Sequence, residues 1–156
     1  MNVVGLFAGI GGFEVGLGRA GHTTLLTCEI FPPAAAVLGA RLVAPNHQDV
    51  RTLDDLPAGT ELLCAGFPCQ DLSQAGKTRG IGGERSGLVD HVFRLLDRRP
   101  VPWVVLENVS FMLHLDRGRA MARLVTAFEE RGYRWAYRLV NSLAFLPQRR
   151  ERVFFV

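Results

Sequence analysis

Three features of this 156-residue sequence carry side chains that could do covalent or acid–base chemistry. Cys69 follows a proline at the end of an apolar run, Glu107 and Asn108 follow the apolar run "WVVL", and "RRER" carries Arg150 and Arg152. A thiol becomes a nucleophile when positive groups favour its thiolate. A carboxyl group at an apolar strand end can donate a proton, because burial would raise its pKa. Together these residues predict nucleophilic catalysis assisted by an acid.

Cys69 could instead be a packing residue or a metal ligand. Cys28 and Cys64 lie inside apolar segments, where a cysteine usually behaves as a small inert hydrophobe, so we assign both to the core. No second cysteine or histidine stands at ligand spacing from Cys69, so we expect no metal site. The alternative for "RRER" is a solvated strand edge, and the alternative for Glu107 is a cap on the next turn.

A second group of residues predicts a nucleoside site. Gly9, Gly11 and Gly12 follow the first apolar segment, and glycines let a backbone approach a ligand closely. Glu29 stands 20 residues after Gly9, near the spacing at which an acid receives ribose hydroxyls. The glycine spacing departs from the dinucleotide pattern, and a tight strand-to-helix turn is the alternative. With Glu29 and Asp49 after the next two strands, a nucleoside-like cofactor is the better hypothesis.

These residues need a scaffold, and the apolar pattern predicts one. Strands are expected at residues 2–7, 23–30, 47–50, 61–67, 101–109, 133–141 and 152–156. Helices are expected from the glycine turn to about residue 21, over 32–43, from 88 and over 120–132. Apolar strands that alternate with helices predict a doubly wound α/β fold, with a mostly parallel sheet covered on both faces. Ligands bind such sheets at the carboxyl ends of the strands, where the candidate residues fall.

Composition bounds the class of protein. Hydrophobic residues make up 48% of the chain and charged residues 21%, which suits one compact domain. The three cysteines lack CxxC spacing, there is no signal peptide, and no apolar run reaches the roughly 18 residues of a membrane span. We therefore expect a reduced, cytoplasmic protein without a membrane partner. The net charge of +3 is only a weak indication of nucleic-acid binding.

Four short motifs along the chain, taken in their order, resemble those of a known protein family. They are "LFAGIGGFEVGL", "GFPCQDLS", "ENV" and "QRRERVFFV", and they extend from Leu6 to Val156. In these motifs the chain resembles the DNA cytosine-5 methyltransferases that use S-adenosylmethionine. The resemblance implies a Rossmann-like methyltransferase fold, with residues 1–156 forming a cofactor-binding catalytic domain of a bacterial or phage-encoded protein.

The resemblance implies cofactor contacts at the first strand ends and at the turn before the cysteine. Glu29 would hold the ribose hydroxyls, Ile30 would pack on the adenine, and Asp49 would bind the adenine amino edge. The full implied set is Phe7, Gly9, Gly11, Gly12, Glu29, Ile30, Asp49 and Pro68.

The resemblance also implies the catalytic roles. Cys69 would add to carbon 6 of a cytosine, and Glu107 would protonate the ring at N3, which makes carbon 5 nucleophilic. Asn108 would order the turn at Cys69, and Arg152, with Arg150 beside it, would reach the cytosine and the thiolate. The partner would be double-stranded DNA with the target base flipped out of the stack. Residues 76–87 would form the loop that closes over it.

Two departures limit the resemblance. Gly5 stands where the family often has an acidic residue. The match also stops after the "QRRER" motif, so the domain is incomplete: the target-recognition region and the final motifs are absent, and a longer chain or a second polypeptide would supply them. The alternatives are an inactive nucleoside-binding fragment and an RNA cytosine methyltransferase, although Phe67 before the proline favours the DNA type. The DNA target and any pairing with a restriction nuclease stay open.

Overall fold

The computed structural model describes residues 1–68 and 87–156. The predicted nucleophile Cys69 and residues 76–86 of the predicted loop lie outside the described residues.

The described residues form a seven-stranded sheet in the order β3-β2-β1-β4-β5-β7-β6. The strands are β1 (Asn2–Leu6), β2 (Thr23–Cys28), β3 (Asn46–His47), β4 (Leu62–Ala65), β5 (Trp103–Val109), β6 (Tyr137–Asn141) and β7 (Glu151–Phe155). The helices are α1 (Gly12–Arg19), α2 (Pro32–Arg41), α4 (Leu88–Arg98) and α5 (Arg119–Glu129), with short 3₁₀ segments η1 (Ser110–Gly118) and η2 (Ser142–Ala144).

Strands β1 to β5 pair in parallel, whereas β7 is antiparallel to both β5 and β6. The reversal has a simple cause. Between β6 and β7 the chain makes only a short hairpin, and a connection that short cannot return to the start of a parallel strand. The predicted fold class, a doubly wound and mostly parallel α/β sheet, is confirmed.

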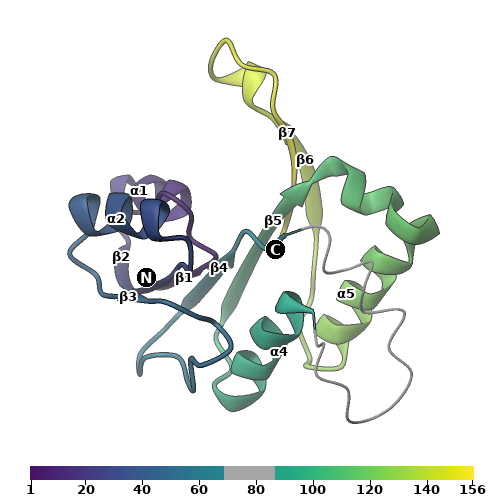
Figure 1. The fold of residues 1–156 in the computed structure, drawn as a ribbon. Coiled ribbons are helices and arrows are strands. Elements are labelled where there is room, and N and C mark those ends of the chain that lie inside the picture. Colours follow the sequence, from purple (N-terminus) through teal and green to yellow (C-terminus); the bar gives the residue numbers. More distant parts are fainter. Residues whose placement is uncertain (69–86) are drawn as a thin grey trace.

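Helices α1 and α2 lie on one side of the sheet and α4 and α5 on the other (Figure 1). Successive side chains of a strand therefore point to opposite helix layers. In β1, Val3 packs with Phe13 and Leu17 of α1, whereas Val4 and Leu6 belong to the larger cluster on the opposite face. This is the period-two pattern of strands that are covered on both faces.

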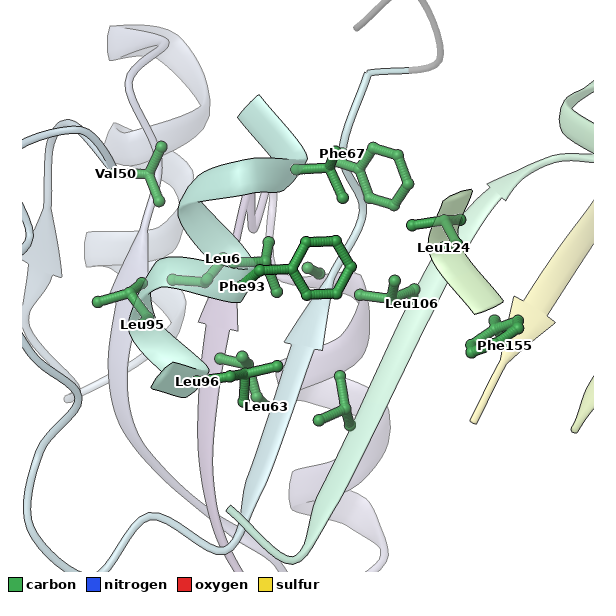
Figure 2. Close-up of a cluster of buried hydrophobic side chains, with 14 of the residues drawn as sticks. Leu6, Val50, Leu63, Phe67, Phe93, Leu95, Leu96, Leu106, Leu124 and Phe155 are labelled. Atoms are coloured by element: carbon green, nitrogen blue, oxygen red, sulfur yellow. The ribbon is translucent and has the colours of Figure 1, made fainter. Parts of the chain in front are cut away.

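The larger cluster lies between the sheet and helices α4 and α5. Leu95 and Leu96 of α4 are buried against the sheet residues Leu6 and Leu63 (Figure 2). Burying one such side chain contributes about 1.5–3 kcal/mol. The helical spacing that predicted a helix from residue 88 is therefore the spacing of its buried face, which fixes α4 firmly on the sheet.

Strands β1 to β5 end at the same edge of the sheet, because they run in parallel. The segments after these strands carry most of the predicted site residues. None of the helices in residues 1–68 and 87–156 is both long and apolar enough to cross a membrane.

Candidate active site

The turn after β1 has an unusual backbone. Phe7, Gly9 and Gly11 all have positive φ angles, of 55°, 56° and 86°. Glycine adopts this conformation without strain, but a bulky residue such as Phe7 does not. The N–H of Gly11 donates to the carbonyl of Ala8 at 2.9 Å, and α1 begins directly afterwards at Gly12. Strained residues of this kind cluster at ligand sites, so the turn is a candidate binding element.

Glu29 links this turn to the end of β2. Its Oε2 accepts the N–H of Gly9 at 2.8 Å, and its Oε1 accepts the N–H of Phe31 at 2.7 Å. Two backbone donors therefore fix the orientation of a half-buried carboxylate. Each oxygen keeps a further lone pair, so Glu29 can also accept hydrogen bonds from the hydroxyl groups of a ligand.

A first hollow of about 420 Å³ opens beside Glu29, and we call it the Glu29 hollow. It brings together five predicted cofactor residues: Phe7, Glu29, Ile30, Asp49 and Pro68. Its other lining residues are Cys28, Gln48, Val50, Arg51, Gly66 and Leu88. Apolar walls with a few fixed acceptors suit a nucleoside.

Asp49 lies on the wall of the Glu29 hollow and accepts hydrogen bonds from the side chain of Arg51. The Arg51 Nε donates to both carboxylate oxygens at 2.9 Å, and Nη2 donates to Oδ2 at 2.5 Å. Hydrogen bonding from the Arg51 side chain holds the pKa of Asp49 below its ordinary value of 3.8. Arg51 was not among the predicted residues, although its position two residues after Asp49 was a signal for it.

A second hollow of about 480 Å³ adjoins the first, and we call it the Glu107 hollow. Four predicted residues besides Phe7 line it: Gly9, Gly12, Glu107 and Arg150. Its remaining lining residues are Ala8, Ile10, Phe13, Gly66 and Phe154. Phe7 and Gly66 line both hollows, so they form a common wall between a nucleoside-sized space and an acidic group.

Glu107 is held by an ion pair. Arg152 Nε lies 2.8 Å from Glu107 Oε1, and both side chains are about one-fifth exposed, at 21% and 22%. The antiparallel register of β5 and β7 brings the two side chains together. Arg152 pairs with Val109, and Glu107 lies two residues before Val109 on the same face of β5. A Cβ added to Gly66 would lie 3.4 Å from Glu107 Oε2, so the second oxygen lies beside the common wall.

Asn108 points to the other face of β5 and is buried. Its Nδ2 donates to the carbonyl of Phe67 at 3.0 Å, and its Oδ1 accepts the N–H of Val109 at 2.9 Å. The amide therefore anchors the residue that precedes Pro68. The anchored backbone leads directly to the predicted nucleophile, which is outside the described residues.

The other two cysteines are buried, as expected for core residues. Burial raises the pKa of both the Cys28 and the Cys64 thiol to about 12. Nearby carboxylates add to the effect, from Asp49 and Glu29 at Cys28 and from Glu14 at Cys64. Neither thiol forms a thiolate near neutral pH, which leaves the described part of the chain without a nucleophilic cysteine.

Among the eight predicted cofactor residues, Gly11 is the one that lines neither hollow. A Cβ added to Gly11 would lie 3.0 Å from the Leu38 side chain of α2, so this glycine faces the helix packing. Gly66 and Leu88 also line the site and were not among the predicted residues. The glycine directly after β4 was a detectable signal, whereas nothing marked Leu88 except its place at the start of a helix. Residues 1–68 and 87–156 contain no cluster of three potential metal ligands.

Comparison with known proteins extends these findings. Residues 1–156 match the family model described as "C-5 cytosine-specific DNA methylase". The chain is 50% identical over 160 aligned residues to "Type II methyltransferase M2.BsuMI" of Bacillus subtilis (strain 168), covering 98% of this chain and 41% of that protein. It is 36% identical to "Type II methyltransferase M.BanI" of Aneurinibacillus aneurinilyticus, covering 97% of this chain and 37% of that protein. The chain therefore spans about two-fifths of the length of these relatives.

Solved structures agree on the fold. The S. pombe Dnmt2 methyltransferase superposes with a TM-score of 0.76 at 21% identity, over 99% of this chain and 50% of its own. A putative DNA modification methyltransferase encoded within an E. coli prophage also gives 0.76, at 23% identity, over 99% of this chain and 45% of its own.

Proposed function

Since the chain belongs to the C-5 cytosine-specific DNA methylase family, we propose that it forms the cofactor-binding and catalytic part of an enzyme that methylates carbon 5 of cytosine in DNA. The observation that carries the proposal is the common wall of Phe7 and Gly66. On one side of it lies a nucleoside-sized hollow with a fixed carboxylate, and on the other side lies Glu107. A methyl donor and an acid-activated base would meet across this wall.

The Glu29 hollow fits the adenosine part of S-adenosylmethionine. Glu29 is fixed by two backbone donors and would accept the ribose hydroxyls, while Phe7 and Ile30 offer apolar surface to the adenine. Asp49 would accept a hydrogen bond from the adenine amino group at the carboxylate lone pairs that Arg51 does not occupy. When bound, the cofactor supplies an electrophilic methyl group.

The chemistry at the base follows from Cys69 and Glu107. The Cys69 thiolate would form a bond to carbon 6 while Glu107 gives a proton to N3, which moves electron density to carbon 5. Carbon 5 would then take the methyl group as the methyl–sulfur bond of the donor breaks. A base would remove the proton from carbon 5, the bond to Cys69 would break to regenerate the thiolate, and the proton at N3 would return to Glu107.

The remaining residues would orient these groups. Arg152 holds one oxygen of Glu107, so the other oxygen is directed toward the common wall. Asn108 anchors the backbone before Pro68, which would fix the approach of Cys69. Arg150 lines the Glu107 hollow and would attract the phosphate or carbonyl oxygens of a nucleotide.

The DNA would present the cytosine flipped from the duplex, because a base inside the stack cannot reach the Glu107 hollow. Base-edge recognition would come from polypeptide beyond the matched region of the relatives, either in the same chain or in a second one.

The test is trapping of the covalent intermediate. The intact protein that contains this chain is incubated with S-adenosylmethionine and duplex DNA carrying 5-fluorocytosine, whose fluorine cannot leave as a proton does. We expect a stable protein–DNA adduct that the Cys69→Ser variant does not form. The Cys64→Ala variant is the matched control and should form the adduct, since Cys64 is buried in β4. An adduct of equal yield in the Cys69→Ser variant, or methyl transfer to tRNA and not to DNA, would overturn the proposal.

A further inference from the structure

Arg94 of α4 bridges two backbone carbonyls that lie far away in the sequence. Its Nη2 donates to the carbonyl oxygens of Val50 and Leu53, at 2.9 Å each. Its Nε lies 3.4 Å from Nδ1 of His91, one turn earlier on the same helix. Hydrogen bonds from a charged donor are the stronger kind, and one guanidinium group fixes two peptide groups here. Arg94 therefore sets the orientation of the backbone between residues 50 and 53.

This backbone belongs to the connection between β3 and β4, which has no helix or strand of its own. Its apolar side chains Val50, Leu53 and Leu56 are buried in the core with exposures of 4%, 7% and 2%. Figure 2 shows Val50 beside α4. The side chains hold the connection against the core, but they do not determine where its peptide groups point. That second task falls to Arg94.

Two of the oriented residues, Val50 and Arg51, line the Glu29 hollow, and Asp49 directly before them lines it too. Leu88 at the start of α4 lines it as well. Helix α4 thus contributes to this hollow both directly, through Leu88, and at a distance, through Arg94. We propose that Arg94 is a positioning residue for cofactor binding: it holds the wall formed by Asp49, Val50 and Arg51 in the geometry that receives the adenine end. The inference rests on the proposed function of the Glu29 hollow.

The residue directly after α4 supplies a matched control. Arg99 pairs with Asp55 of the same connection, with Nη2 2.6 Å from Oδ2. Both partners of this pair are about 40% exposed, and neither lines the Glu29 hollow. Arg99 therefore ties the same two segments together without touching the wall. A purely structural role of Arg94 would make the two arginines equivalent for cofactor binding.

The experiment measures binding of S-adenosylhomocysteine to the intact protein by calorimetry, for the wild type and for the Arg94→Met and Arg99→Met variants. We expect Arg94→Met to weaken binding about tenfold, the value of one hydrogen bond, and Arg99→Met to change it less than about twofold. Amide exchange gives a second readout. The N–H of Thr52 donates to the carbonyl of Asp49 at 3.0 Å, and its exchange should quicken only in the Arg94 variant.

The outcomes separate the two proposals. Wild-type protein that binds no S-adenosylhomocysteine would overturn the proposed function together with this inference. Wild-type protein that binds, with equal effects of the Arg94 and Arg99 substitutions on affinity and exchange, would overturn the inference alone. If Arg94→Met does not fold, Arg94→Lys replaces it. An ammonium group lacks the planar fork of arginine, so the Lys variant should raise the KM for the cofactor with kcat within about twofold. An unchanged KM in a folded Lys variant would equally contradict the inference.

Discussion

The carboxylate of Glu14 fills the space beside Gly5 in which a side chain at that position would begin. A Cβ added to Gly5 would overlap Glu14 Oε1, and Glu14 itself is only 1% exposed. Neither carboxylate oxygen has a hydrogen-bond partner among the described residues. A buried acid on α1 thus lies directly against Gly5 of β1.

Glu14 should make the protein less stable as the pH rises. Burial raises the pKa of Glu14 above its ordinary value of 4.5. Above pH 4.5 the unfolded chain releases this proton while the folded chain retains it, so the free energy of unfolding falls as the pH climbs through the folded pKa. Glu14→Gln lacks this titrating group. Its free energy of unfolding should exceed that of the wild type by about 1 kcal/mol at pH 8 and should equal it at pH 4.5. Thermal unfolding at the two pH values measures it, and a gain that does not depend on pH would contradict the assignment.

The Gly5→Ala variant should be destabilised, because its methyl group would displace the Glu14 carboxylate. Overpacking of this kind costs about 1–3 kcal/mol. Gly16 is the matched control: it is exposed on α1 and has no atom within 4 Å of an added Cβ. Gly16→Ala should therefore stabilise the protein by about 0.5–1 kcal/mol through helix propensity. Chemical denaturation compares the two, and equal effects would show that Gly5 is not a packing constraint.

Removing Arg51 should return the pKa of Asp49 toward 3.8, since the Arg51 side chain is the main cause of its lowering. Below pH 3.8 the wild-type carboxylate would remain ionised where that of Arg51→Ala is protonated. The titration is followed by NMR of the Asp49 side chain. The variant also frees carboxylate oxygens on the wall of the Glu29 hollow, so it should bind S-adenosylhomocysteine severalfold more tightly. Arg41→Ala, at the end of α2, controls for the loss of one positive charge, and equal affinities of the two variants would refute the competition.

Asn108→Ala should slow adduct formation at Cys69 more than it weakens cofactor binding. The substitution leaves the Phe67 carbonyl without its Nδ2 donor and costs about 1–3 kcal/mol as a buried, unpaired group. Asn108→Asp should be slower still, because a carboxylate would face that carbonyl. Single-turnover trapping on 5-fluorocytosine DNA measures the rates. Variants that trap DNA as fast as the wild type would show that the anchor does not orient the nucleophile.

Much of the fold could be predicted, because the spacing of apolar residues indicates which face of a helix or strand is buried. Leu88, Val92, Leu95 and Leu96 predicted a helix, and three of them form the buried face of α4. The direction of β7 was not visible in its composition, since an antiparallel strand inside the sheet can be as apolar as a parallel one. The short 3₁₀ segment η1 also has no long periodic pattern by which to detect it.

The candidate site divides in the same way. Glu29 and Glu107 could be placed from sequence, because Glu29 directly follows β2, Glu107 lies near the carboxyl end of β5, and parallel strands end at the same edge of the sheet. The partners of these residues depend on tertiary register. Arg152 reaches Glu107 only through the antiparallel pairing of β7, and Arg94 reaches Val50 across 44 residues. No local pattern encodes either distance.

The wall that Phe7 and Gly66 share has a thermodynamic consequence. A ligand in the Glu29 hollow that shifts Phe7 also reshapes the Glu107 hollow, so the two affinities are linked. Linkage of this kind is reciprocal: whatever factor a ligand in one hollow applies to the affinity of the other hollow, a ligand in the other applies to the affinity of the first. Occupation of either hollow would thereby change the binding free energy of its neighbour by an equal amount.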